Sequence, residues 1–311
     1  MQAYIGVTDY DWFNLLRDVP QLEEVNFWQP GGNQIFKALK PGELFLFKLH
    51  YPWNKIVGGG IFAYSTLLPI SLAWETFGKK NGANGLLEMR RRVGRLRRQL
   101  ENSLADYTIG CILLEQPFFL PEKQWIVVPD WKAPIVQGKT YDLSIEPGRS
   151  LWRQLHLNTL LASVNYKENI TSGVKEEQAR YGKPLTTFPR LGQGSFRVLV
   201  TDAYERRCAV TNERTLPALD AAHIKPYSES GLHVISNGIL LRRDLHALLD
   251  EGYVTITPSI KLQVSRRIKE EYENGRDYYR LQGTTLRLPT NPENHPSQEY
   301  IKWHNENKYR G

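Results

Sequence analysis

The segment LDAAHIKPYSESGLHVISNGILLRRDLHALLDEGY, residues 219–253, decides the fold of the C-terminal half of the chain. Its run LDAAHI is short and apolar, and its run NGILLR is entered through an Asn-Gly pair, so both predict strands. RRDLHALLD then predicts a short helix with an acidic first turn and a glycine stop signal. This order puts His223 at the end of one strand, Asn237 at the start of the next and His246 on the helix. We expect the three side chains to converge on one metal-sized pocket.

The length of 311 residues favours two domains, each with its own core. Pro, Gly and hydroxyl residues near 184–197 separate two patterned regions. We therefore predict one domain at 1–165, a linker at 166–185 and a second domain at 186–311. The second domain is expected to open with a helix in GSFRVLVTDAYERRC, whose apolar residues share one face.

The N-terminal half consists of short apolar and aromatic runs between turn signals. YIGVT, ELFLFKL, KIVGGGIFAY, TIGCILLE and WIVVP predict buried strands. NGLLEMRRRVGRLRRQLENSL has apolar residues near helical spacing and predicts a helix. One helix among several strands predicts a small mixed β-barrel, so the fold class of the chain is α+β.

Composition narrows the class of protein. No apolar run approaches the length of a membrane span, and the N-terminus lacks the features of a signal peptide, so we expect a cytoplasmic protein with no membrane partner. Cys111 and Cys208 are the only cysteines, and any metal must be held by His, Asp or Asn. The net charge of +7 favours polyanionic partners such as nucleic acid, although a merely basic protein explains the charge equally well.

Three stretches of the sequence, taken in order, carry a resemblance to a known family. RCAVTN, LDAAHIKPY and HVISNGILLRRDLHALLDEGYVTI resemble the ββα-metal nuclease domain of the HNH endonuclease family, over about residues 190–260. The resemblance implies hydrolysis of DNA phosphodiester bonds with a single divalent cation, Mg²⁺ first, with Mn²⁺, Ni²⁺ or Zn²⁺ as alternatives. Many family members bind a structural zinc through cysteine pairs. With Cys208 alone in this region, we expect apolar packing to hold the core instead.

The resemblance also implies roles for individual residues. His223 would be the general base, because a neutral histidine can take a proton from water near neutral pH. His246 corresponds to the helix-borne metal ligand, and Asp220 is the expected second ligand. Many HNH sites place the acid directly before the histidine, where this chain has Ala222. Asn237 is expected either to ligate the metal or to brace the loop that orients His223.

The order of elements in the first 150 residues, with KPGE between helix and strand, is similar to EVE and related PUA-superfamily domains. These domains bind nucleic acid, and the EVE branch is associated with modified bases. An extruded base needs aromatic faces to stack on and polar groups to identify its edge. For this role we predict Trp28, Tyr51 and Trp53 as faces and Asn26 and Asn33 as edge contacts. Packing inside the barrel is the alternative for each aromatic residue.

Arginines in MRRRVGRLRRQL are predicted to contact DNA phosphates, because no acid interrupts the run. The alternative is an ordinary solvated helix face. His233 is expected to be a loop or phosphate-contacting residue. The full set of predicted DNA-binding residues is Arg90, Arg91, Arg92, Arg95, Arg97, Arg98, Arg190, Gln193 and Arg197.

These observations together predict a modification-dependent, type IV-like restriction endonuclease. Its first domain recognises modified cytosine in double-stranded DNA, and its second cuts nearby, since an HNH core carries little sequence information. Cutting both strands with one site per chain generally needs two active sites or two nicks, so a homodimer is an expectation from mechanism only. The alternatives are a non-catalytic protein that binds modified nucleic acid and an HNH endonuclease that cuts unmodified DNA.

Overall fold

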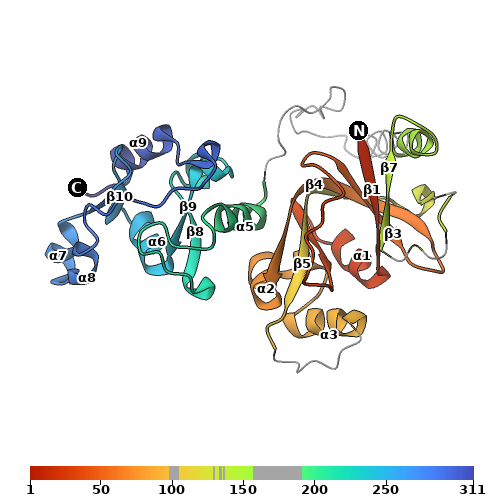
Figure 1. Ribbon diagram of the computed structural model, residues 1–311, viewed down its shortest axis with the longest axis horizontal. Coiled ribbons are helices and arrows are strands. Elements are labelled where there is room, and N and C mark those ends of the chain that lie inside the picture. The colour runs from red at the N-terminus through yellow and green to blue at the C-terminus, as the bar shows by residue number, and fades with distance from the viewer. Residues whose placement is uncertain (98–104, 129, 133–134, 136, 157–190) are drawn as a thin grey trace, which may run out of the picture. The chain divides into compact units, whose positions relative to one another are not determined.

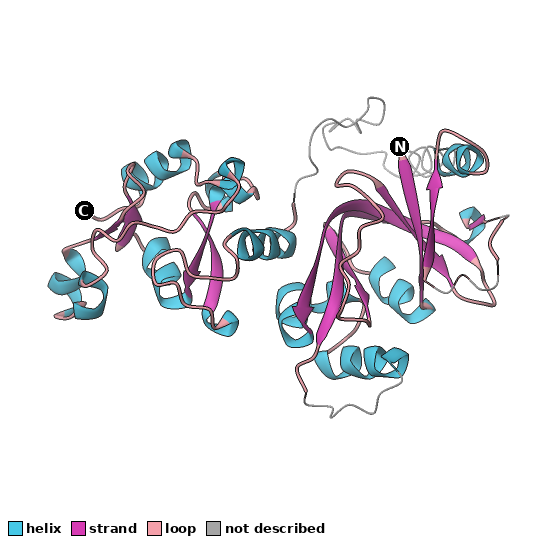
Figure 2. Cartoon of the chain, viewed as in Figure 1, coloured by secondary structure: helices cyan, strands magenta, loops and turns pink. Residues whose placement is uncertain are grey.

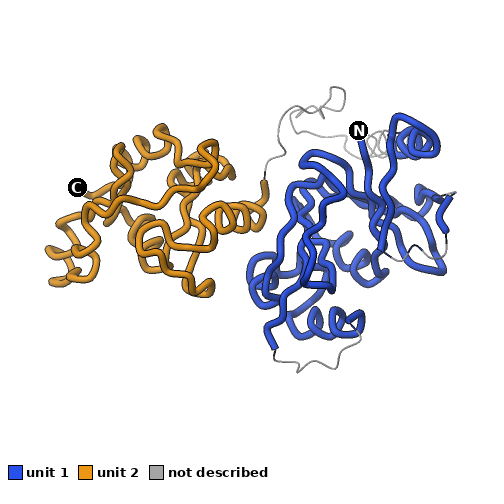
Figure 3. Tube along the Cα trace, viewed as in Figure 1, with its two compact units in different colours: residues 1–189 blue, residues 190–311 orange. Residues whose placement is uncertain are grey.

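The computed structural model describes residues 1–97, 105–128, 130–132, 135, 137–156 and 191–311. The chain divides into two compact units, residues 1–189 and 190–311, here called the N-terminal and C-terminal units (Figure 3). The predicted linker at 166–185 lies outside the described residues. None of the helices in the described ranges is long and apolar enough to cross a membrane.

The N-terminal unit is mostly sheet (Figure 2). The predicted strands are confirmed, and the predicted arginine-rich helix begins at Leu86. Two further helices, α1 and α2, were not expected. Residues 148–156 are also helical. The elements are β1 (Gln2–Thr8), α1 (Tyr10–Arg17), β2 (Glu24–Gln29), β3 (Leu44–Leu49), β4 (Lys55–Pro69), α2 (Ile70–Phe77), η1 (Gly78–Asn81), α3 (Leu86–Arg97), β5 (Thr108–Phe119), η2 (Glu122–Gln124), β6 (Ile126–Val127) and β7 (Gly138–Asp142).

Both faces of the sheet are covered, as strand β3 illustrates. Successive side chains of a strand point to opposite faces. Phe45 and Phe47 pack in one core with Trp12 of α1, whereas Leu46 packs in a second core with Leu151 of the helical stretch 148–156. Burial on both sides explains why LFLFKL is an almost continuous apolar run.

The sheet is open, so the predicted closed barrel is wrong for the described residues. Its strand order is β2-β5-β4-β3-β1-β7, with β6 added to β4, and no pairing among the described residues joins β2 to β7. Strands β1 and β3 are parallel, whereas the other neighbours are antiparallel. Register shifts in the pairing of β4 with β3 and β5 mark bulges, which bend a strand. A Cβ on Gly58 would lie 2.2 Å from the Phe118 carbonyl oxygen, so this close approach requires glycine.

The C-terminal unit contains the predicted strand, loop, strand and helix as β8, β9 and α6 (Figure 1). The helix predicted in GSFRVLVTDAYERRC forms from Gln193 to Ala203. The elements are α5 (Gln193–Ala203), η3 (Leu216–Ala218), β8 (Leu219–His223), η4 (Tyr227–Glu229), η5 (Ile235–Asn237), β9 (Gly238–Arg242), α6 (Arg243–Asp250), β10 (Val254–Ile256), β11 (Leu262–Val264), α7 (Arg267–Tyr272), α8 (Arg276–Tyr279), η6 (Pro292–Asn294) and α9 (Gln298–Asn307).

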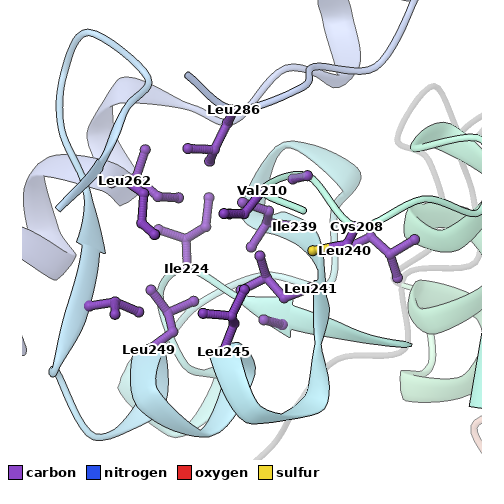
Figure 4. Packing of buried hydrophobic residues seen from close by; sticks show 14 of the residues in the cluster. Cys208, Val210, Ile224, Ile239, Leu240, Leu241, Leu245, Leu249, Leu262 and Leu286 are labelled. Atoms are coloured by element: carbon purple, nitrogen blue, oxygen red, sulfur yellow. The ribbon is translucent and has the colours of Figure 1, made fainter. Parts of the chain in front are cut away.

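One apolar cluster holds this unit together (Figure 4). Ile239 and Leu241 of β9 meet Leu245 of α6, and Cys208 is buried with them as a free thiol. Leu262 of β11 brings the second hairpin onto the same cluster. The β8-β9 hairpin and α6 are therefore anchored by apolar packing, which holds their polar side chains in place.

Candidate active site

The β8-β9 hairpin fixes the position of His223. The two strands are antiparallel, with His223 opposite Gly238 and Asp220 opposite Leu241. A Cβ on Gly238 would lie 2.3 Å from Val200 Cγ2 and 3.0 Å from the Phe196 ring. The glycine of the Asn-Gly pair thus lets α5 pack closely on the hairpin, which brings the Phe196 ring to His223.

His223 is held by rings on its face and at its edge. Phe196 stacks on its imidazole, with ring centroids 3.8 Å apart and an interplanar angle of 11°. His223 Nε2 lies 2.9 Å from His233 Nδ1, and Tyr227 stacks on His233. Burial first, and then the nearby charges of His233 and His246, lower the pKa of His223 to about 4. His223 is therefore neutral at pH 7 and has a nitrogen lone pair, as a general base must.

His246 lies between two carboxylates. Its Nδ1 is 3.2 Å from Asp220 Oδ2, and its Nε2 is 3.3 Å from Asp250 Oδ2, one turn further along α6. Burial disfavours the charged ring, but the hydrogen bond to Asp220 and the charge of Asp250 outweigh it and raise the pKa of His246. Burial raises the pKa of Asp250. Asp250 was not predicted as a site residue, although its spacing of four from His246 was visible in the sequence.

Asp220 also pairs with Arg197 of α5, whose Nε is 3.3 Å from Asp220 Oδ1. Burial would raise the pKa of this carboxyl, but the hydrogen bond from His246 and the charge of Arg197 lower it overall. Asp220 is therefore an anion at neutral pH. Arg197, predicted to bind DNA, is held beside this carboxylate. Gln193 is exposed in the first turn of α5, and Arg190 lies outside the described residues.

Asn237 braces the loop between the two strands, which is one of the two roles predicted for it. Its side chain is fully buried. Its Oδ1 accepts a hydrogen bond from the Lys225 backbone N–H, and its Nδ2 donates to the carbonyls of Lys225 and Leu232. The predicted role of metal ligand does not fit, because the amide oxygen is buried and bound to backbone.

The donor chemistry at this site suits a divalent cation. Asp220 and His246 offer a carboxylate oxygen and an imidazole nitrogen 3.2 Å apart. A cation bound by one or two protein ligands commonly completes its shell with water and substrate phosphate. Within the described residues, no group of three His, Cys, Asp or Glu side chains is placed to hold an ion. The Asp220 and His246 pair is compatible with a site of two protein ligands.

The predicted DNA-binding arginines of α3 fall into two groups, those that contact other protein groups and those that are exposed. Arg92 pairs with Glu88 and donates to the Gly82 carbonyl at 2.8 Å. Arg97 donates to the Thr108 carbonyl, and Arg90 lies 3.9 Å from an Asp106 oxygen. Although no acid interrupts the arginine run, Glu88 directly before it therefore neutralises part of its charge. Arg91 and Arg95 are exposed, and Arg98 lies outside the described residues.

The N-terminal unit contains a cavity of about 590 Å³, here called the N-terminal cavity. Trp28 and Asn33, two of the five predicted base-recognition residues, line it. Asp9, Trp12 and His50 also line it, and no spacing in the sequence indicated them. The Trp28 Nε1 donates to the backbone carbonyl of Asn81 at 2.9 Å, so the indole is fixed in place.

The other three predicted base-recognition residues lie elsewhere. Asn26 is fully buried, and its Nδ2 donates to Asn81 Oδ1, so its side chain is not exposed to a base in this structure. Trp53 stacks on Tyr10 with ring centroids 4.5 Å apart, and Tyr51 is 83% exposed. Neither Trp53 nor Tyr51 lines the N-terminal cavity.

Comparisons with known proteins bear on the C-terminal unit. Residues 208–257 match a family model described as HNH endonuclease. A solved structure described as a modification dependent TagI restriction endonuclease is similar at 10% sequence identity and a TM-score of 0.30, covering 98% of this chain and 82% of that chain. No curated protein matches. The matched residues span β8, η5, β9 and α6, and they include His223 of β8, Asn237 of η5 and His246 of α6. The C-terminal unit thus contains an HNH endonuclease domain, and the protein is a DNA endonuclease.

Proposed function

We propose that the protein is a modification-dependent restriction endonuclease. In this proposal residues 1–165 bind DNA that carries modified cytosine, and residues 186–311 hydrolyse a phosphodiester bond nearby. The stacking of His223 on Phe196, in the same unit as the Asp220 and His246 pair, is the observation that supports the catalytic part. The N-terminal cavity, which Trp28 and Asn33 line, supports the recognition part.

His223 is assigned as the general base. It accepts a proton from water as the water oxygen attacks phosphorus, and the bond from phosphorus to the leaving oxygen breaks. Stacking on Phe196 and the contact with His233 hold the imidazole in one orientation, which limits the motion that would misplace the proton acceptor. The leaving oxygen is protonated from solvent.

Asp220 and His246 are assigned as the residues that hold the divalent cation. When bound, the cation would supply Lewis-acid stabilisation of the charge that develops on the phosphate. Asp250 contacts the second ring nitrogen of His246, and such a carboxylate fixes the orientation and tautomer of a ligand histidine. We propose Mg²⁺ as the cation, with Mn²⁺, Ni²⁺ and Zn²⁺ to be compared.

The N-terminal cavity is assigned to an extruded base. Its volume lies in the range of small-molecule sites, and the Trp28 indole gives it an aromatic face. Asn33, Asp9 and His50 offer polar groups that could identify the edge of a base. A relation to EVE and PUA domains and an intracellular, homodimeric state are parts of the same proposal.

The test is digestion of matched duplexes that differ only in their cytosines: unmodified, methylated, hydroxymethylated or glucosylated. The full chain is assayed with and without divalent cation, and His223→Ala serves as the inactive control. Cation-dependent cleavage of at least one modified duplex, with the unmodified duplex intact, supports the proposal. Equal cleavage of all four points to an HNH endonuclease that ignores modification. Binding to modified DNA without cleavage points to a non-catalytic protein.

A further inference from the structure

We infer that His233 is a positioning residue of the active site, which selects the tautomer of His223 whose Nδ1 carries the free lone pair. This inference rests on the base role proposed for His223. The residue comes from the loop between η4 and η5, ten positions after His223.

The contact between the two histidines is geometrically well defined. His223 Nε2 and His233 Nδ1 are 2.9 Å apart, and the two rings meet edge to face at 61°. Phe196 of α5 covers a face of His223, and Tyr227 of η4 covers a face of His233 at a centroid distance of 4.4 Å. Each imidazole is thus restrained by an aromatic ring on its face and by the other imidazole at its edge.

The loop that carries His233 is itself anchored. Asn237 donates a hydrogen bond to the carbonyl of Leu232, the residue directly before His233, and it also binds both backbone groups of Lys225. Asn237 therefore acts on His223 through the loop and His233. This connection gives the motif asparagine a physical role that does not need contact with a cation.

The position of the hydrogen between the two rings decides whether His223 can accept a proton from water. When neither imidazole is charged, the two rings share one hydrogen across the gap between Nε2 of His223 and Nδ1 of His233. If His233 Nδ1 carries it, His223 must hold its own proton on Nδ1 and has no lone pair left for water. If His223 Nε2 carries it, His223 Nδ1 is bare and can accept a proton. Only the second arrangement supports base catalysis, and it requires His233 to present an unprotonated Nδ1.

The experiment compares two substitutions at position 233 in the full chain. His233→Phe keeps an aromatic ring against Tyr227 but removes the acceptor. His233→Asn places an amide oxygen near the position of Nδ1 and keeps the acceptor. Loss of an orienting contact of this kind typically costs 10–100-fold in activity. We expect about that loss of kcat for His233→Phe with KM unchanged, and substantial recovery of kcat in His233→Asn.

A spectroscopic readout separates this inference from the proposed function. Long-range ¹H–¹⁵N correlation spectra of ¹⁵N-histidine-labelled protein report which ring nitrogen carries hydrogen, and the His223→Ala spectrum identifies the His223 signals. We expect the Nε2–H form of His223 in the unsubstituted protein and a mixture of forms in His233→Phe. An Nδ1–H form in the unsubstituted protein, or unchanged kcat in His233→Phe, overturns the inference. Unchanged cleavage by His223→Ala would instead overturn the base role, whatever the tautomer.

Discussion

The two units of the molecule place their polar and aromatic side chains in different ways. In the C-terminal unit, the interacting side chains come from one short segment of the chain: His246 lies against Asp220, and His223 against His233. In the N-terminal unit, the cavity collects residues from distant segments, such as Asp9, Trp28 and His50. The proposed catalytic side chains thus come from one short segment, whereas the proposed recognition cavity depends on long-range folding.

The largest effect is expected from removing His223, the proposed general base. We expect His223→Ala to lower the rate of DNA nicking by about 10²- to 10⁴-fold, the usual contribution of general-base catalysis. DNA affinity should stay near that of the unsubstituted protein. Single-turnover nicking and a binding titration measure the two effects. His295→Ala is the matched control, since His295 bonds the Pro289 carbonyl, and it should keep its activity. Wild-type turnover in His223→Ala would remove the assignment.

The hydrogen bonds of Asn237 predict that this motif residue contributes to the stability of the C-terminal unit. Asn237→Ala leaves three backbone groups of Lys225 and Leu232 without their partner. Each buried polar group left unsatisfied costs about 1–3 kcal/mol. We expect a fall in the free energy of unfolding by at least one such increment, measured by urea denaturation. An unchanged unfolding midpoint would show that the loop does not need the amide.

Recognition in the N-terminal unit is tested by two tryptophans in different places. Trp28 lines the N-terminal cavity, and Trp53 stacks on Tyr10. Stacking on a base is worth about 1–3 kcal/mol, or about 5- to 150-fold in affinity. Trp28→Ala should therefore lose preference for modified duplexes by that factor, whereas Trp53→Ala should keep it. Competition binding with paired duplexes measures the preference. The same loss of preference in both variants would show that recognition does not depend on the N-terminal cavity.

The arginines of α3 give a smaller effect. Arg91 and Arg95 are exposed, whereas Arg92 is bound to Glu88 and Gly82. If both exposed residues contact phosphates, replacing each with Gln should reduce the salt slope of DNA binding by about 0.9. Arg92→Gln, the matched control, should leave the slope nearly unchanged and lower thermal stability. Equal slopes in all variants would place α3 away from DNA.

The last prediction concerns the pH dependence of stability. The pKa of His223 is about 4 in the folded chain and 6.5 for an unperturbed histidine. Between these values the unfolded chain binds more protons, so the free energy of unfolding falls as pH falls from about 6.5 to 4. His223→Gln removes this contribution, and its stability should decline less over that interval. Denaturant titrations at several pH values measure the difference, and parallel declines would contradict the burial of a neutral His223.

Sequence reasoning succeeded where structure is local. The runs LDAAH, GILLR and RDLHALLD lie within 32 residues and fold as predicted, because each carries its own periodicity and turn signal. The closed barrel failed because closure depends on pairing β2 with β7, strands that lie far apart in the chain. No local pattern specifies such a pairing.

Predictions for several individual residues also differ from what the structure shows. Asn26 has the chemistry of a base contact, but its side chain is fully buried and binds Asn81, 55 residues away. Glu88 neutralises Arg92 from four positions before it, a spacing that the sequence displayed just outside the arginine run. His233 was expected in a loop, and its contact with His223 follows from the path of that loop rather than from a fixed spacing.

The parallel pairing of β1 with β3 has a consequence for how specificity could diverge. Parallel neighbours end at the same edge of a sheet, and the residues just past these two ends, Asp9 and His50, line the N-terminal cavity. The turn after β2 adds Asn33. All three positions lie outside the packed strands, so they can be exchanged without altering either apolar core. Homologous proteins could therefore acquire preferences for different bases by substitutions in these three turns, over an unchanged sheet.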